Sequence, residues 1–336
     1  MKTTLKNLCL GILLGTASVL VTSCGSKSSE THDHTTADHE HFACPMHPDQ
    51  VGHEGETCPT CGMKLEKVNA AQAANTNQYF MAYASEPAML EAGKPGKFSL
   101  TPKIKGNESV PVPLDIEHDK KMHLIVVSKD LAYFDHIHPE FQGTGNYDIK
   151  VLGKDERFTA RFANETRFDA GGEYVLFADY RPTGANHQLE RIGISVAGTP
   201  YKNQQFTAQK VTSVTDGYEI TFEPEGGKFV NEGTMHIAAV IKKDGKEVSA
   251  DQFENYLGAK AHIVVVSEDT QDYLHVHPEV VDGRLDLHTT FGRIGVFRAW
   301  LQFKTEGQIH TADFTLLVEA GKAPESSHDQ GEAHQH

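Results

Sequence analysis

The sequence predicts a mainly β protein, in which a small Cys/His module is followed by two tandem immunoglobulin-like β-sandwich domains. Three observations support this fold class. Residues 122–141 and 261–280 are copies of each other, with nine of twenty positions identical. Short β-branched runs, HLIVVS (123–128) and HIVVVS (262–267), have the length of buried strands and are followed by turn-forming residues. Helical periodicity is hard to find in either copy.

The first 23 residues have the features of a targeting segment. Lys2 and Lys6 precede an apolar run from Leu8 to Val21, which is too short and too early for a structural transmembrane helix. The run leads into VTSC, which ends at Cys24. This arrangement resembles a bacterial lipoprotein signal, and the resemblance implies that Cys24 is lipidated and becomes the new N-terminus. An ordinary secretory signal with an incidental cysteine is the alternative.

Polar segments divide the rest of the chain. Residues 24–41 and 320–336 are rich in polar residues and contain histidines, so we expect a flexible tether and a disordered tail. Their histidines either are simply solvated or collect metal ions at low affinity. Residues 69–77 are expected to form a linker, and the two sandwich repeats are expected to span 78–198 and 204–319.

Composition narrows the function. The 336 residues include 20 histidines, and the formal net charge is −15. An acidic surface repels phosphate backbones, so nucleic-acid binding is not expected. The same charge favours solubility and attracts cations. This many histidines makes metal binding a candidate function.

The module at residues 42–68 has paired metal-ligand spacing. A two-residue gap lets both members of a pair reach one ion from a tight turn, and two such pairs make a tetrahedral set. Methionines beside the ligands favour soft ions such as Cu(I). A structural zinc ribbon and a disulfide framework are the alternatives. The predicted ligands are Cys44, His47, Cys58 and Cys61, with Met46 and Met63 as soft neighbours.

This module resembles the heavy-metal-binding domain found on copper-transporting ATPases and on adaptors of copper/silver efflux pumps. The matching stretches are FACPMHP and GETCPTCGMKL. Phenylalanine replaces the usual tyrosine, and one extra residue separates the glycine from the cysteine. The resemblance implies heavy-metal handling without specifying the metal.

The repeats carry histidines at matching positions. In a strand, residues two apart share a face, so a His-x-His pair points one way. A hairpin would bring a third histidine beside the pair, and we expect a fourth at the start of the last strand to join them. Neutral imidazole suits copper and zinc, and buried structural histidines are the alternative. The two predicted sets are His123, His136, His138 and His187, and His262, His275, His277 and His310.

The two copies are not identical around these histidines. Met122 adjoins His123 as a candidate soft ligand, whereas Ala261 holds the matching position in the second copy. Glu140 and Glu279 follow the pairs as outer partners or as solvated charges. His236 and His288 occur in the second copy alone and are expected to be surface histidines, although His288 could assist the site.

The repeats resemble a little-characterised family of secreted β-sandwich domains that recur beside heavy-metal-binding segments. The second copy, from NYLGAKAHIVVVSEDTQDYLHVHPE to HTADFTLLV, fits this pattern well. The first copy keeps the histidines but lacks the YLG lead-in. The resemblance supports the predicted β-sandwich fold more firmly than it supports metal binding by the repeats.

Together these features predict a non-enzymatic lipoprotein of the bacterial cell envelope, anchored by lipid to a bacterial membrane, either in the outer membrane or facing the periplasm. It would bind copper, as Cu(I) or Cu(II), with zinc as the second choice, and would buffer the ion or deliver it to a metal-efflux pump component in metal resistance. One alternative is a copper/zinc-dependent oxidoreductase of superoxide-dismutase-like type. The other is a partner-binding spacer that binds metal only at residues 42–68.

Overall fold

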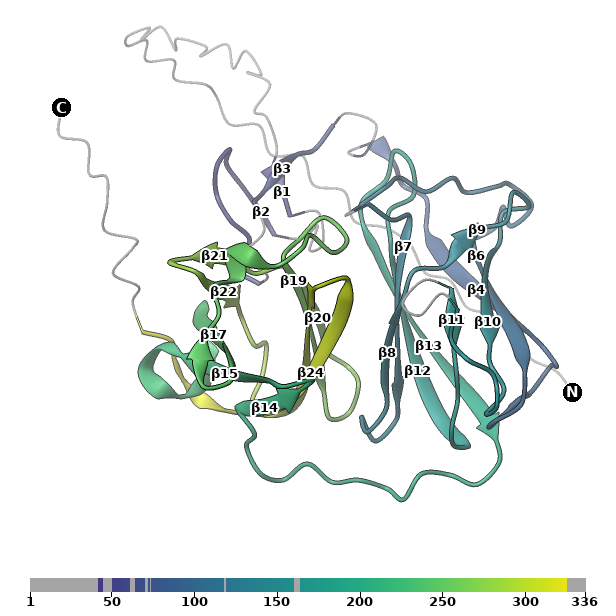
Figure 1. Cartoon of the computed structure of the whole chain (residues 1–336). Coiled ribbons are helices and arrows are strands. Elements are labelled where there is room, and N and C mark those ends of the chain that lie inside the picture. Colours follow the sequence, from purple (N-terminus) through teal and green to yellow (C-terminus); the bar gives the residue numbers. More distant parts are fainter. Residues whose placement is uncertain are drawn as a thin grey trace, which may run out of the picture. The chain divides into compact units, whose positions relative to one another are not determined.

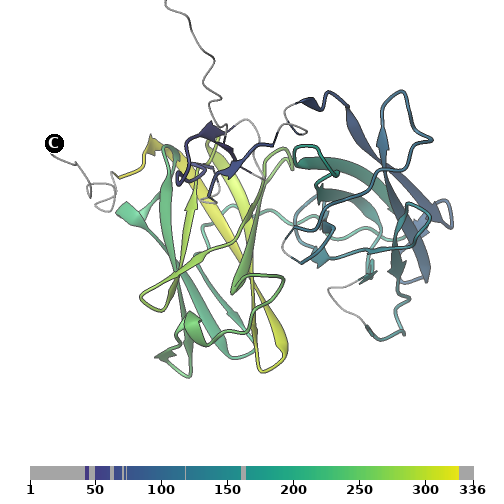
Figure 2. The ribbon, with the colours of Figure 1, turned by 90° about the horizontal axis from the view of Figure 1, so that it is seen from above.

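The computed structural model describes residues 42–44, 50–60, 64–69, 72, 74–117, 119–159 and 164–324. In these residues strands are the main secondary structure, and the strands of each repeat form two layers (Figure 1; turned by 90° in Figure 2). The mainly β prediction is confirmed. Among the described residues, no helix has the length and apolarity that crossing a bilayer requires.

The first repeat is a sandwich of two sheets. One sheet has the order β11-β10-β6-β4, with β9 also paired to β10, and the other has the order β5-β13-β12-β7-β8. The short β5 pairs in parallel with the last strand, β13, whereas the longer strands are antiparallel neighbours. This division of strands between the two sheets is that of an immunoglobulin-like sandwich. The bounds are β4 Tyr79–Glu86, β5 Leu90–Glu91, β6 Gly96–Ile104, β7 Met122–Ser128, β8 Phe134–Ile137, β9 Glu140–Phe141, β10 Tyr147–Val151, β11 Glu165–Thr166, β12 Gly172–Tyr180 and β13 Gln188–Ala197.

The second repeat has the same plan. Its sheets have the orders β14-β15-β17-β22-β21 and β16-β24-β23-β19-β20, with β18 paired to β17. Again a short strand, β16, pairs in parallel with the last strand, β24. The bounds are β14 Thr212–Thr215, β15 Tyr218–Pro224, η1 Glu225–Gly227, β16 Phe229–Glu232, β17 Met235–Lys243, β18 Lys246–Glu247, η2 Ala250–Gln252, β19 Ala261–Ser267, β20 Tyr273–Val276, β21 Glu279–Val281, β22 Arg284–Thr289, β23 Gly295–Thr305 and β24 Gln308–Lys322.

The extra residues of the first copy lie between β10 and β12. They include β11, which adds a short parallel strand to β10. The second copy connects β22 to β23 directly by a short loop at residues 290–294. The insertion therefore leaves the histidine-bearing hairpin of the first repeat unchanged.

The small module forms a three-stranded sheet of order β2-β1-β3, from β1 Phe42–Ala43, β2 Val51–Gly52 and β3 Glu66–Lys67. Its buried residues belong to the same apolar core as the second repeat, and Cys44 and Cys58 are among them. Thr289 Oγ at the end of β22 donates a hydrogen bond of 2.7 Å to the carbonyl of Thr60. The module is thus packed on one sandwich.

Strands β7 and β19 are buried on both faces, which explains their continuous apolar sequences. Leu124 and Val126 face the core of the first repeat. Ile125 and Val127, on the opposite face, pack in a separate apolar cluster with Val264 of β19 and other residues of the second repeat. The outer face of one repeat therefore covers the outer face of the other.

Aromatic pairs make this contact self-complementary. Phe134 stacks on Trp300 with ring centroids 4.5 Å apart, and Phe177 stacks on Tyr273 at 4.8 Å. In the sequence alignment Phe134 matches Tyr273, and Phe177 matches Trp300. Each pair is therefore the image of the other, as in an isologous dimer interface. The duplicated chain packs as an internal pseudo-dimer.

Candidate metal centre

Hairpins position the histidines at the edge of this contact. In the first repeat β7 and β8 are antiparallel, with Ile125 opposite His136 and Leu124 opposite Ile137. The second repeat has the same register, with Val264 opposite His275. The hairpin expected from the spacing is confirmed. It sets His123 against the first His-x-His pair, and the ring centroids of His123 and His138 are 5.0 Å apart.

Hydrogen bonds fix which nitrogen is protonated in two rings of the first repeat, those of His123 and His136. Nε2 of His123 lies 3.2 Å from the carbonyl oxygen of Glu117, which can only accept, so Nε2 carries the proton. Nδ1 of His136 lies 2.9 Å from Oε1 of Gln302, and the amide nitrogen of Gln302 donates to Thr311 Oγ at 3.0 Å. His136 therefore donates from Nδ1. Its Nε2 and the Nδ1 of His123 are left as lone-pair donors.

These lone pairs face each other. Nδ1 of His123 is 3.5 Å from Nε2 of His136, and Nε2 of His138 is 3.1 Å from the same atom. The facing nitrogens of His123 and His136 are both unprotonated, so they cannot hydrogen-bond to each other but can bind one cation together, whereas Nε2 of His138 can donate to His136 when no cation is bound. The arrangement has the chemistry of a metal site built from imidazoles.

The second repeat has the same arrangement at its first two histidines, His262 and His275. Nε2 of His262 donates to the carbonyl of Tyr256 at 2.7 Å, and its Nδ1 lies 3.2 Å from Nε2 of His275. Nδ1 of His275 is held by the carboxylate of Asp179, 3.5 Å away. Asp179 matches Gln302 in the alignment, and Tyr256 matches Glu117. Each repeat thus supplies the side chain that orients the other's central histidine, as partners outside a coordination sphere do.

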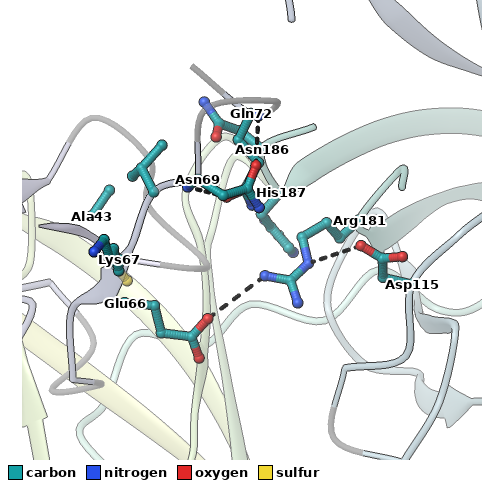
Figure 3. A pocket seen from close by; sticks show the side chains of 11 residues that line it. Ala43, Glu66, Lys67, Asn69, Gln72, Asp115, Arg181, Asn186 and His187 are labelled. Atoms are coloured by element: carbon teal, nitrogen blue, oxygen red, sulfur yellow. Dashed lines mark hydrogen bonds and ion pairs between the residues drawn. The ribbon is translucent and has the colours of Figure 1, made fainter. Parts of the chain in front are cut away.

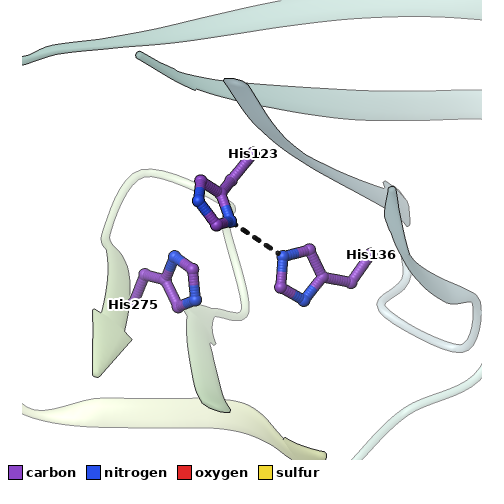
Figure 4. Close-up of side chains that lie close together, drawn as sticks. All are labelled: His123, His136 and His275. Atoms are coloured by element: carbon purple, nitrogen blue, oxygen red, sulfur yellow. Dashed lines mark hydrogen bonds between the residues drawn. The ribbon is translucent and has the colours of Figure 1, made fainter. Parts of the chain in front are cut away.

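The two sets merge into one cluster. Ligand atoms of His123, His136 and His275 lie within 4.8 Å of one another, as do those of His262, His275 and His277. Figure 4 shows the rings of the first group turned toward a common space, with His275 contributed by the second repeat. We expected a separate site on each sandwich. The structure instead places both sets in one centre between the repeats.

Burial keeps this centre neutral. His136 and His262 are fully buried. Loss of hydration, reinforced by the neighbouring imidazoles, lowers the pKa of His136 well below its usual value. Burial and His275 do the same to the pKa of His262. The lone pairs therefore remain available at mildly acidic pH. His277 is half-buried and lies at the more accessible side of the cluster.

His187 does not join the imidazoles of its own repeat, contrary to the expectation. Its Nε2 contacts Asp179 Oδ1 very closely, and Glu117 Oε2 is 4.0 Å away. Burial lowers the pKa of His187, but the charge of Asp179 and its hydrogen bond outweigh burial and raise it overall. Burial tends to raise the pKa of Asp179, and His187 and His275 nevertheless bring it well below its usual range. His187 is therefore linked to the cluster through a carboxylate.

Glu117 lies in the same group as Asp179 and His187. Burial raises its pKa to about 7, against the opposing effects of the His187 and Arg181 charges. The ligand atoms of Glu117, Asp179 and His187 also lie within 4.8 Å of one another. This second group is therefore adjacent to the imidazole cluster and shares Asp179 with it.

His310 was assigned to the second set, and that placement is wrong. It lies opposite Phe303 on β23, which in turn lies opposite Ala261, one residue away from His262. Because neighbouring residues of a strand face opposite ways, His310 points into the sandwich core while His262 points out. Its ring contacts Asp216 at 2.9 Å and Thr305 at 2.8 Å.

The same alternation of strand faces shows whether the difference between Met122 and Ala261 affects the cluster. Both residues are completely buried in the apolar core of their own repeat, on the face opposite the neighbouring histidine. Met122 is therefore not a ligand of this cluster, and the difference between the copies at this position does not alter the two halves of the centre.

Two orienting side chains, Asp179 and Gln302, were missed in the sequence. Each occupies the matching position of an otherwise apolar strand, in FADY and WLQF. A polar residue at the same place in both copies, directly opposite His123 and His262 in the strand register, was the available signal. Its meaning depends on the other repeat, which the sequence does not place.

The cysteine module contributes a second candidate centre. Cys44 and Cys58 are each 1% exposed. Met46, His47, Cys61 and Met63 lie outside the described residues, as does the predicted lipidation site Cys24. The convergence of the four predicted ligands therefore stays a prediction.

A polar pocket lies between the module and the first repeat. Its lining includes Cys44 and His187, and Figure 3 shows Arg181 between Glu66 and Asp115. Arg181 Nη1 is 3.7 Å from Glu66, and its Nε is 3.8 Å from Asp115. The pocket lining thus includes a module cysteine and His187, which contacts Asp179 beside the histidine cluster.

Comparison with known families agrees with this organisation. Residues 41–68 match the family described as Heavy metal binding domain. Residues 75–194 and 212–320, together about two thirds of the chain, match one family twice. No curated protein matches the chain. The chain therefore belongs to the family described as Domain of unknown function (DUF8832), two copies of which follow a heavy metal binding domain.

Proposed function

We propose that this protein is a non-enzymatic copper-binding lipoprotein of the bacterial cell envelope, which buffers the ion or delivers it to an efflux system. The observation that carries the proposal is a pair of contacts between imidazole lone pairs, His123 with His136 at 3.5 Å and His262 with His275 at 3.2 Å, which meet in one buried cluster. The protons of His123, His136 and His262 face a carbonyl or an amide oxygen, and Nδ1 of His275 faces the carboxylate of Asp179, so the facing nitrogens in these two pairs are unprotonated. A cation bound by these nitrogens stabilises the arrangement directly.

The donor types favour copper. Imidazole binds Cu(II), Cu(I) and Zn(II), and affinity in one site rises toward copper in the divalent series. The module adds thiolates, which prefer the reduced ion. Thiolate sites bind less tightly in acid, because protons compete for sulfur. The buried imidazoles with lowered pKa values compete less with protons, so the two centres suit uptake and retention under different conditions.

Burial supports storage rather than catalysis. His123, His136, His138, His262 and His275 are all at most 3% exposed. An oxidoreductase needs an open coordination position that substrate can reach. The polar pocket between Cys44 and His187 supports passage of ions between the module and the cluster.

Metal titration of the purified chain with Cu(I), Cu(II) and Zn(II) tests the proposal. We expect the variant H138Q/H277Q to lose tight copper binding at the cluster, since it removes one imidazole ligand from each repeat. The matched control is H310Q, which changes a histidine on the inner face of a strand and should retain all copper. Replacing Cys58 by serine should remove binding at the module alone.

Two outcomes contradict the proposal in different ways. If H138Q/H277Q folds and binds as much copper as the unchanged chain, the histidine cluster between the repeats is not a copper site. If the copper-loaded chain turns over superoxide at a rate that H138Q/H277Q abolishes, the protein is an oxidoreductase.

Anchoring is tested separately. We expect the unchanged chain to sediment with membranes in a bacterial host and to incorporate labelled fatty acid, and Cys24→Ala to do neither. Release of both proteins into the soluble fraction would refute the lipid anchor without touching the metal proposal.

A further inference from the structure

A second group of ligands lies on the outer face of the second repeat. His236 on β17 and His288 on β22 are directly opposite each other, and their ring centroids are 4.1 Å apart. Nε2 of His288 donates to Asp286 Oδ2 at 2.8 Å. One ligand atom from each of the three residues lies within 4.8 Å of the others. All three are half-buried and so remain reachable from solvent.

Strand register explains why these side chains meet. Met235, Ile237, Leu285 and Leu287 are core residues of the two strands. The residues between them must face outward, because strand faces alternate. Directly opposite residues of an antiparallel pair come within about 5 Å. Asp286 is also opposite Glu279 of β21, so a further carboxylate adjoins the group.

The first repeat supplies a natural comparison. Its matching strands keep the register, with Lys150 opposite Lys97 and Asp148 opposite Glu140. Lysines thus stand at both positions that are histidines in the second repeat, while the two carboxylates are kept. The fold does not require histidine on this face, and two ammonium groups there exclude a cation.

We propose that His236, Asp286 and His288 form a solvent-accessible binding site for a divalent transition-metal ion of intermediate softness, such as Cu(II), Ni(II) or Zn(II). Two imidazoles and a carboxylate are donors that such ions accept, and Glu279 is placed to supply another oxygen. The site is present in the second repeat alone. It shares no residue with the cluster between the repeats, so it stands or falls independently of that centre.

Exchange of the two pairs of side chains tests the site. H236K/H288K reproduces the first repeat and should bind one Ni(II) ion fewer per chain by calorimetric titration. The converse variant K97H/K150H should bind one more. Ni(II) should also protect His236 and His288 of the unchanged chain from carbethoxylation, read by peptide mass spectrometry.

The outcomes are decisive even if one variant is unstable. Lysines are accommodated at the matching exposed positions of the first repeat, and melting of each variant is checked beforehand. If the stoichiometry is the same in all three chains, or if Ni(II) leaves both histidines fully reactive, the proposal is wrong. H138Q/H277Q serves as the matched control and should keep this site intact.

Discussion

Replacing Asp179 by asparagine perturbs the link between His187 and the histidine cluster at a single atom. The carboxylate is 3% exposed; its Oδ1 accepts from His187, and its Oδ2 lies 3.5 Å from Nδ1 of His275. Asparagine has the same shape but one acceptor. It can serve only one ring, and its amide then presents a donor to the other.

The expected cost follows from these contacts. A hydrogen bond to a charged group contributes about 1.5–3 kcal/mol, and breaking a buried ion pair costs about 3–5 kcal/mol. Asparagine keeps one acceptor and removes the penalty of burying a charge, so we expect a loss of about 2–4 kcal/mol in the free energy of unfolding.

The loss should depend on pH in a defined way. The folded pKa of Asp179 is depressed, so its contribution is complete above the unfolded value of about 3.9 and is lost as pH falls below it. The folded pKa of His187 is raised, so its contribution is complete below about 6.5 and is lost as pH rises through the folded value. The difference between the two chains should therefore be largest from about pH 4 to 6.5.

Urea unfolding of both chains from pH 3.5 to 8.5, without added metal, measures this difference. Asp169→Asn is the matched control, since Asp169 is an exposed carboxylate paired with Arg167 at 2.8 Å, and it should cost under about 1 kcal/mol. A difference for Asp179→Asn that is flat across this range, or below about 0.5 kcal/mol throughout, would refute the reasoning.

Three further results are expected. Trp300→Ala removes a ring that stacks on Phe134 between the repeats, and it should lower the free energy of unfolding in urea by about 3 kcal/mol. Phe177→Ala removes the equivalent stack on Tyr273 and should have a similar effect. Variants as stable as the parent chain would contradict the interface. In a Cys58→Ser background, copper affinity of the cluster should change less than tenfold between pH 7.5 and 6, because the pKa values of His136 and His262 are already low; a steeper loss would show that protons compete there. Cys58→Ser itself should destabilise the second repeat, since Cys58 lies in its apolar core; unchanged melting would separate the module from that core.

Several features were readable from sequence because they depend on neighbours in the chain. Short β-branched runs identified β7 and β19, and the spacing of thirteen positions from His123 to His136 predicted the hairpin that the register confirms. Local reasoning failed one strand further on. His187 and His310 both lie near the start of the last strand of their repeat. His187 nevertheless contacts Asp179 beside the cluster, whereas His310 faces the core of its sandwich. The side chain's direction depends on the register across three strands, which local sequence does not show.

The sequence by itself determined the duplication, the sandwich fold, the matching histidine triplets and the cysteine module, because each is a pattern of spacing or identity along the chain. Only the tertiary structure decided that the triplets form one centre. Asp179 orients a histidine 96 positions away in the other repeat, and Gln302 does the same in return. These bonds exist because the outer faces of two copies bury apolar surface against each other. The sequence shows which residues form the outer face of each repeat, but it does not show that the other repeat covers that face.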